Sequence, residues 1–258
     1  SAHGWPHAEL SLAPTPTLQL ENSTEGEQLF ILERMAWNDQ AATAAEVTAL
    51  HLFRDLFAEE AWRPGEQISV GSLAVLFTDL RGSTRLYREI GDAVAFGHVM
   101  NHFDVLREAI AAEGGALVKT IGDSVMAVFR RPVASLRAVL RAQQALASPP
   151  EGGRPLLLKA GIHYGPCIAV TLNDRLDYFG STVNTAARLE SLSSGGDVII
   201  SAAVRVDPEV AELLAQADDT HRTEPFEAML KGFDEERFEL WRVALGATAA
   251  THPTAVER

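Results

Sequence analysis

The stretch that decides the fold reads Val75-Leu76-Phe77-Thr78-Asp79-Leu80-Arg81-Gly82-Ser83-Thr84. An apolar run with strand character ends in the carboxylate Asp79, and a glycine turn and two hydroxyl residues that can open a helix follow. This arrangement suits a metal-bound polyphosphate, because the carboxylate binds a divalent ion and the backbone N–H groups of the turn and helix start bind phosphate oxygens. Taken alone, the stretch is equally compatible with a buried strand in which Asp79 is a turn residue.

Composition and charge narrow the class of protein. The chain has 258 residues, 47% of them apolar, which suits one large domain or a medium domain with an appendage. Its formal net charge of −13 argues against nucleic acid and anionic membranes as partners, because both need a cationic surface. A polyphosphate substrate remains compatible with this charge, since bound metal ions neutralise local repulsion.

Three features of the sequence indicate a cytoplasmic protein. No apolar run approaches the roughly 20 residues of a membrane span. The N-terminus carries no signal-peptide pattern. The single cysteine, Cys167, cannot form an internal disulfide and fits a reducing compartment. We therefore expect a cytoplasmic location and no membrane partner for this part of the protein.

The pattern divides the chain into four segments, residues 1–37, 38–66, 67–245 and 246–258. We expect the first to be a partly disordered remnant of an upstream regulatory domain, with a possible β-hairpin, and the last to be a disordered tail. The second is predicted to be a connecting helix, capped by Asn38 or Asp39 and running to about Glu60, followed by a linker. This helix either transmits a signal to the main domain or braces it.

Strands and helices alternate within residues 67–245. Strands are predicted at 73–79, 116–121, 124–129, 156–163, 167–172, 198–200, 224–230 and 237–243, and the main helices begin near Ser83, Asp92, Pro132, Ser181 and Pro208. The order strand, helices, hairpin, helix, hairpin, helix predicts an α+β fold, a ferredoxin-like βαββαβ sandwich with extra strands and helices. Neighbouring hairpins imply antiparallel pairing, which distinguishes this fold from a doubly wound parallel sheet.

A second informative stretch reads Leu117-Val118-Lys119-Thr120-Ile121-Gly122-Asp123-Ser124. Asp123 lies at the predicted hairpin tip, beside the end of the strand that carries Asp79. Two carboxylates from neighbouring strand ends can bind two divalent ions about 3.5–4 Å apart, the arrangement used for in-line phosphoryl displacement. An isolated Asp123 would instead be interpreted as a turn residue.

The third stretch, residues 177–190, reads Asp-Tyr-Phe-Gly-Ser-Thr-Val-Asn-Thr-Ala-Ala-Arg-Leu-Glu. Asn184 and Arg188 are four residues apart on a predicted helix and share one face. The guanidinium of Arg188 suits the charge that builds on a phosphate in a transition state, and Asn184 can orient a hydroxyl or a sugar ring. In most proteins an isolated pair of this kind is a solvated helix face.

Together the three stretches resemble the catalytic domain of class III adenylate and guanylate cyclases, over roughly residues 67–245. The resemblance implies the class III nucleotide cyclase fold, with Asp79 and Asp123 binding two divalent cations, Mg²⁺ or Mn²⁺. It also implies that Asn184 orients the ribose and that Arg188 stabilises the transition state. The resemblance further implies that the triphosphate is bound by the loop Leu80, Arg81, Gly82, Ser83 and Thr84, and by Lys231.

Lys119 and Asp177 match the family's adenine-reading pair. Lysine donates to the ring N1 of adenine and aspartate accepts from its 6-amino group, an order that also complements adenine on donor–acceptor grounds alone. Guanylate cyclases of the family typically carry glutamate and a small residue at these positions. Taken singly, Lys119 would be an edge-strand lysine and Asp177 a loop carboxylate.

One position departs from the family pattern. Many members carry a second lysine two residues after the position of Lys231, where it grips the triphosphate. This chain carries Phe233 there. Either Lys231 or Arg81 substitutes for the missing lysine, or triphosphate binding is weaker.

The resemblance implies an adenylate cyclase, which converts ATP to 3′,5′-cyclic AMP and pyrophosphate and acts in signal transduction. Family members are dimers whose active sites are shared between subunits, so a homodimer with two equivalent sites is expected. The alternatives are a catalytically weak nucleotide-binding dimer module and a guanylate or nucleotide-promiscuous cyclase.

Overall fold

The computed structural model describes residues 44–50, 67–149, 154–172, 175–216, 221–233 and 236–245. All of them belong to one compact unit, Ala42–Arg258, and the other unit, Ser1–Ala41, lies outside the described residues. The hairpin expected before residue 37 and the tail expected after residue 245 therefore also lie outside them. No helix in the described part of the chain is long and apolar enough to cross a lipid bilayer.

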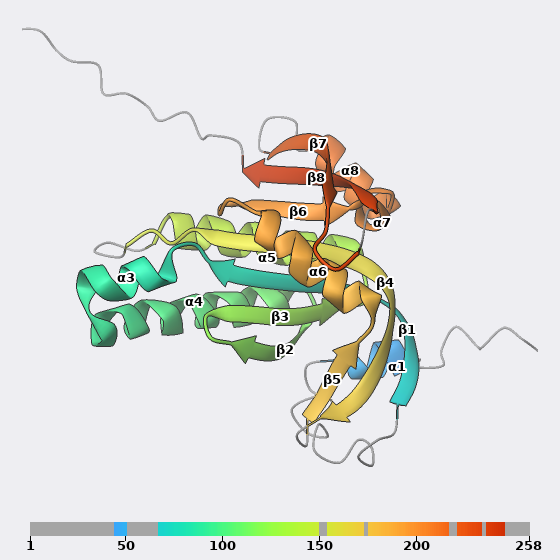
Figure 1. Ribbon diagram of the computed structural model, residues 1–258, viewed down its shortest axis with the longest axis horizontal. Helices are drawn as coiled ribbons and strands as arrows, with labels where there is room; N and C mark the ends of the chain where they lie inside the picture. The colour runs from blue at the N-terminus through green and yellow to red at the C-terminus, as the bar shows by residue number, and fades with distance from the viewer. Residues whose placement is uncertain are drawn as a thin grey trace, which may run out of the picture. The chain divides into compact units, whose positions relative to one another are not determined.

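The described strands form one eight-stranded sheet in the order β2-β3-β1-β4-β6-β8-β7, with β5 paired to β4 (Figure 1). Only β4 and β6 pair in parallel among them. This mixed but mainly antiparallel sheet confirms the predicted α+β class. The strand bounds are β1 (Gln67–Leu80), β2 (Ala116–Ile121), β3 (Ser124–Phe129), β4 (Leu158–Leu172), β5 (Arg175–Phe179), β6 (Asp197–Ser201), β7 (His221–Met229) and β8 (Arg237–Leu245).

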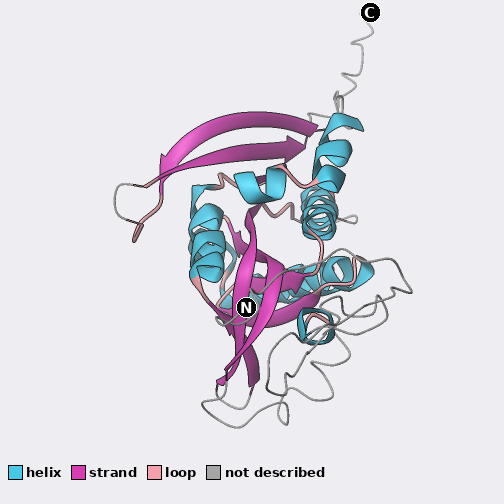
Figure 2. Cartoon of the chain, turned by 90° about the vertical axis from the view of Figure 1, so that its right-hand side faces the viewer, coloured by secondary structure: helices cyan, strands magenta, loops and turns pink. Residues whose placement is uncertain are grey.

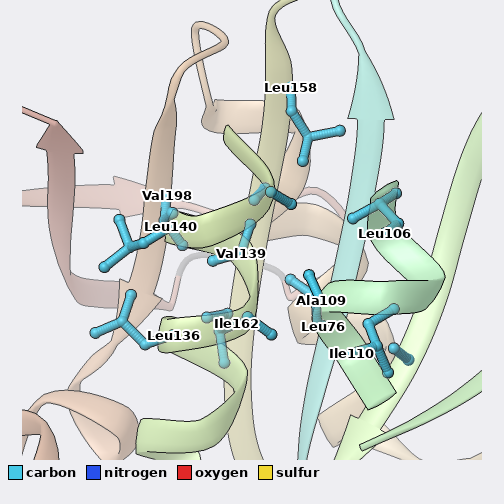
Figure 3. Packing of buried hydrophobic residues seen from close by; sticks show 14 of the residues in the cluster. Leu76, Leu106, Ala109, Ile110, Leu136, Val139, Leu140, Leu158, Ile162 and Val198 are labelled. Carbon is cyan, nitrogen blue, oxygen red and sulfur yellow. The ribbon is translucent and has the colours of Figure 1, made fainter. Parts of the chain in front are cut away.

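Helices cover both faces of the sheet (Figure 2). The described helices are α1 (Ala44–Thr48), α3 (Ser83–Ile90), α4 (Asp92–Ala112), α5 (Pro132–Ala147), α6 (Ser181–Leu192), α7 (Ala202–Arg205) and α8 (Pro208–Gln216). Alternate side chains of β1 enter different cores because successive residues of a strand point to opposite faces. Leu76 and Leu80 pack with Leu106 of α4 in one cluster, part of which Figure 3 shows. Leu73 and Val75 pack with Ala186 of α6 in the other.

The structure corrects the prediction for residues 156–172. Two strands parted by Gly165-Pro166 were expected, but β4 runs unbroken from Leu158 to Leu172. Pro166 pairs with Ser72 in the β1–β4 ladder, and its carbonyl accepts a hydrogen bond from Thr182 Oγ1 of α6 at 2.7 Å.

Strand β5, which carries Asp177 and pairs with the end of β4, was not among the predicted strands. The helix expected from Asn38 or Asp39 to about Glu60 is described only over residues 44–50, where α1 ends at Thr48 and Ala49 and Leu50 are not helical; the rest of its range lies outside the described residues. At this point the hydroxyl of Thr48 donates to the carbonyl of Ala44 at 2.7 Å, a local bond that competes with regular helix.

Candidate active site

The structure brings Asp79 and Asp123 together as predicted. The pairing of Thr78 with Val125 places Asp79 opposite Ser124, at the tip of the β2–β3 hairpin. There the hydroxyl of Ser124 donates to Asp79 Oδ1 at 2.7 Å. Gly122 holds a φ of 64°, which lets the two-residue turn present Asp123 next to the end of β1.

The donor set at this strand end suits a divalent cation. Asp123 Oδ2 is buried and has no hydrogen-bond partner among the described residues. A buried carboxylate oxygen without a partner is costly, so this side chain would be stabilised by a bound cation or by a buried water. No group of three or more histidine, cysteine, aspartate or glutamate side chains gathers around a possible metal in the described part of the chain. The two carboxylates would therefore need substrate or water oxygens to complete a metal's coordination.

The turn after β1 presents free backbone donors. Gly82 precedes α3 in a left-handed conformation, with φ 72° and ψ 26°, and its side-chain-free cap leaves the first N–H groups of α3 without a side-chain acceptor. Glycine suits this position because other residues adopt this φ at a cost. Leu80, Arg81, Gly82 and Ser83 line a cavity of about 370 Å³ beside the turn. Such N–H groups at a helix start attract anions.

Three arginines, Arg81, Arg85 and Arg154, line the same cavity. Arg85 and Arg154 bind Glu89 at 2.5 Å and 2.8 Å, and these hydrogen bonds, that from Arg154 first, lower the pKa of Glu89. Arg81 lies against the loop after α6, because a Cβ on Gly195 would meet Arg81 Cδ at 3.0 Å. The three arginines outnumber the single glutamate of the lining, so the cavity is positive on balance.

The predicted base-reading residues form an ion pair. Lys119 Nζ of β2 lies 2.5 Å from Asp177 Oδ2 of β5. The Asp177 side chain is 9% exposed, and its other oxygen accepts the backbone N–H of Tyr178 at 2.8 Å. The Lys119 side chain is 37% exposed, so it lies closer to the protein surface than the carboxylate of Asp177. The pair presents a donor beside an acceptor at one point of the protein surface.

Helix α6 carries Asn184 and Arg188 on its exposed side. Its inner side lies directly on β4, because Gly161 has no side chain: a Cβ there would lie 2.1 Å from the backbone nitrogen of Glu190. Lys159 of β4 adds a partly buried ion pair to Glu190 at 2.6 Å. These contacts fix the height and rotation of α6.

The structure does not bring all predicted residues together within one chain. None of the hydrogen bonds or ion pairs of the described residues links Asn184 or Arg188 to Asp79 or Asp123. Lys231 is exposed in the turn between β7 and β8. The ring of Phe233 packs edge-on against Phe238, with centroids 5.3 Å apart, in a small cluster with Leu230 and Leu240.

Sequence reasoning missed the residues that support the site. Ser124, Lys159 and Gly161 hold Asp79 and α6 in place, yet each is an ordinary strand or turn residue in the sequence. Lys159 lies directly opposite Asp79 in the β1–β4 ladder. Only a strand register would have revealed these neighbours, and register depends on long-range pairing.

Comparison with known proteins agrees with this geometry. A family described as the adenylate and guanylate cyclase catalytic domain matches residues 66–236. The adenylate cyclase of Lachancea kluyveri is 32% identical over 153 residues, which cover 51% of this chain and 8% of that protein. The adenylate cyclase of Mycosarcoma maydis is 30% identical over 200 residues, which cover 66% of this chain and 8% of that protein. The chain thus spans less than a tenth of the length of these relatives.

Solved structures share the fold. The adenylyl cyclase CyaB from P. aeruginosa superposes with a TM-score of 0.56 at 24% identity, covering 69% of this chain and 96% of that one. The guanylate cyclase domain of a protein from Catenaria anguillulae, solved with GTP, gives a TM-score of 0.57 at 20% identity, covering 70% and 100%. On the match over residues 66–236, the chain belongs to the family of adenylate and guanylate cyclase catalytic domains.

Proposed function

We propose that this chain is an adenylate cyclase domain that converts ATP to 3′,5′-cyclic AMP and pyrophosphate. The observation that carries the proposal is the Lys119–Asp177 ion pair at 2.5 Å. Adenine offers an acceptor at N1 next to the donor of its 6-amino group, and this pair offers the complementary donor and acceptor. Guanine presents a donor and an acceptor in the opposite order, which would leave the charged groups facing like partners.

The chemistry needs positioning more than covalent help from the protein. The ribose 3′-hydroxyl gives its proton to water and its oxygen forms a bond to the α-phosphorus. The bond from that phosphorus to the oxygen that bridges to the β-phosphate breaks, and its electron pair leaves with pyrophosphate. Arg188 would balance the charge that builds on the α-phosphate, and Asn184 would orient the ribose. The loop Leu80–Thr84, which includes the side chain of Arg81, would hold the outer phosphates together with Lys231. Bound at Asp79 and Asp123, Mg²⁺ or Mn²⁺ would supply activation of the 3′-hydroxyl and neutralisation of the triphosphate.

The proposed active unit is a homodimer in the cytoplasm. Asn184 and Arg188 stand on an exposed helix face with no bond to the carboxylate pair of their own chain, so a second copy can supply them. A two-fold axis would then form two equivalent sites, each with the carboxylates of one protomer and the base-reading pair, Asn184 and Arg188 of the other.

Two alternatives rest on specific observations. Phe233 packs into its own hairpin, so the lysine that many family members place there has no counterpart, which favours a weak nucleotide-binding module. The similarity to a guanylate cyclase domain solved with GTP leaves a guanylate or promiscuous cyclase as the other alternative.

The deciding experiment measures the cyclic AMP that purified protein forms from ATP and the cyclic GMP that it forms from GTP, each with Mg²⁺ or Mn²⁺. The assay runs across protein concentration, with the oligomeric state followed by sedimentation. We expect cyclic AMP and a specific activity that rises as dimer forms. A confirmed dimer without product would refute the proposal, and ATP binding without turnover in calorimetry would support the binding module. Asp123→Asn serves as the inactive control.

A further inference from the structure

Helix α4 contains a fully buried histidine, His102. His102 lies in the middle of α4 and is 0% exposed, and neither of its ring nitrogens has a hydrogen-bond partner among the described residues. Its ring contacts Phe103 at a centroid distance of 4.9 Å. Burying unpartnered polar atoms costs free energy, so such a group calls for an unseen water or ion, or for a function.

The packing of α4 places His102 under the end of β1. Val99 and Leu106 lie one turn before and after it on the same helix face, and both pack in one cluster with Leu76 and Leu80 of β1. Thr78 lies between those two leucines on the same face of the strand, and its buried Oγ1 also lacks a partner among the described residues. The core between α4 and β1 therefore contains a polar layer made of His102 and Thr78.

Charge links this layer to the metal-binding pair. Burial lowers the pKa of His102, which keeps the imidazole neutral, while the backbone of Val99 and, to a smaller extent, the charges of Asp123 and Asp79 raise it. A neutral imidazole has one N–H donor and one acceptor nitrogen. Besides the His102 ring and Thr78 Oγ1, Asp123 Oδ2 is also a buried polar group without a hydrogen-bond partner among the described residues. Three polar partners of this kind are what one buried water needs.

We propose that His102 is a positioning residue that holds the carboxylate of Asp123 through one buried water, shared with Thr78 Oγ1, from the side of the sheet opposite the substrate. Fixing one carboxylate oxygen leaves the other aimed at the cation and prevents the side chain from rotating when the site is empty. Residues that orient metal ligands in this way typically change metal affinity by about 10–100-fold. The inference rests on the proposed assignment of Asp79 and Asp123 to the metal.

The test measures binding of Mn²⁺ alone by electron paramagnetic resonance, and the dependence of activity on Mn²⁺ and on ATP. His102→Leu should raise the Kd for Mn²⁺ about 10–100-fold and raise the KM for Mn²⁺ more than the KM for ATP. His102→Gln retains an N–H donor and should recover part of the loss. The matched control is His163→Leu, which removes a part-buried histidine bonded to Ser201 and should lower thermal stability without changing the Kd for Mn²⁺.

The outcomes separate this inference from the proposed function. A folded His102→Leu that binds Mn²⁺ like the wild type overturns the role of His102. If that variant does not fold, Thr78→Val and His102→Gln decide, because wild-type affinity in both would overturn it equally. If Asp123→Asn also binds Mn²⁺ normally, the metal assignment itself fails. Loss of binding in Asp123→Asn alone would leave the proposed function intact and remove only the part assigned to His102.

Discussion

Lys119 Nζ and Asp177 Oδ2 are 2.5 Å apart, although 58 residues separate them in the chain. Their strands do not pair with each other: β2 pairs with β3, and β5 pairs with β4. The pair therefore links two strands, β2 and β5, that are not neighbours in the sheet. Burial of Asp177 is offset by Lys119 and by the backbone N–H of Tyr178, so the acceptor is held rigid before any base arrives.

Replacing the donor should change base selection. Lys119→Glu removes the charged donor for adenine N1 and introduces an acceptor that suits guanine, so the ratio of kcat/KM for ATP to that for GTP should fall about 10–100-fold. Arg107→Glu reverses a charge in a solvent-exposed pair on α4 and is the control for net charge. An unchanged ratio in Lys119→Glu would remove this residue from base recognition.

Removing the hydroxyl that fixes Asp79 should weaken metal use. Ser124→Ala deletes the 2.7 Å hydrogen bond to Asp79 Oδ1, so the carboxylate gains freedom to rotate. A bond to a charged group is worth about 1.5–3 kcal/mol, and we expect the KM for Mn²⁺ to rise about tenfold or more. Ser135→Ala removes a similar hydroxyl from α5, bonded only to the carbonyl of Pro132, and should leave that KM unchanged. Equal KM values in the two variants would contradict the role of Ser124.

A single methyl group at Gly161 should displace α6. Gly161→Ala would place Cβ 2.1 Å from the nitrogen of Glu190 and 2.6 Å from the carbonyl carbon of Leu189, both backbone atoms that cannot rotate away. Overpacking of this kind costs about 1–3 kcal/mol, and activity should fall further because Asn184 and Arg188 move with the helix. Gly97→Ala, at an exposed position of α4, meets nothing within 4 Å and should stabilise the fold by about 0.5–1 kcal/mol. Urea denaturation of both variants measures the difference.

The sequence predicted the carboxylate pair because its geometry is local. An apolar strand that ends in Asp79 and a hairpin whose two-residue turn contains Asp123 each follow from short patterns, and the Thr78–Val125 pairing then brings them together. The length of β4 was not predicted, because Gly165-Pro166 is a turn signal in the sequence, whereas long-range pairing with Leu73 and Ser72 keeps both residues in the strand. Strand β5 was missed because its five residues become a strand by pairing with β4, not by their own pattern.

The supporting residues were beyond the reach of the sequence for a different reason. His102 looks like any polar residue of an amphipathic helix until the packing shows it to be fully buried. Gly161 looks like a weak point of a strand until α6 is seen to lie on it. Such roles depend on the distance between elements, which residue patterns do not encode.

The segment before the domain is attached next to the Lys119–Asp177 ion pair. Tyr178, which follows Asp177, donates its hydroxyl to the carbonyl of Thr48 at 2.9 Å, and Ala49 is buried in the same cluster. Tyr178→Phe should weaken the docking of residues 44–50 by about 1 kcal/mol, seen as about fivefold faster amide exchange in that segment. Tyr164→Phe is the control, because no side-chain hydrogen bond of the described residues involves Tyr164. Equal exchange in both variants would show that the hydroxyl does not hold the segment.

Acid should destabilise the fold through His163. Burial lowers its pKa to about 4, and its Nδ1 lies 2.8 Å from the hydroxyl of Ser201. An unfolded histidine has a pKa near 6.5, so below that pH the unfolded chain takes up a proton that the folded chain refuses. Stability is therefore complete above about pH 6.5 and falls as the pH drops toward 4. Between pH 7 and pH 5 the loss from this group should approach about 2 kcal/mol. His163→Asn does not titrate, so its free energy of unfolding should vary less over this interval; the same pH slope in both proteins would exclude His163 as the cause.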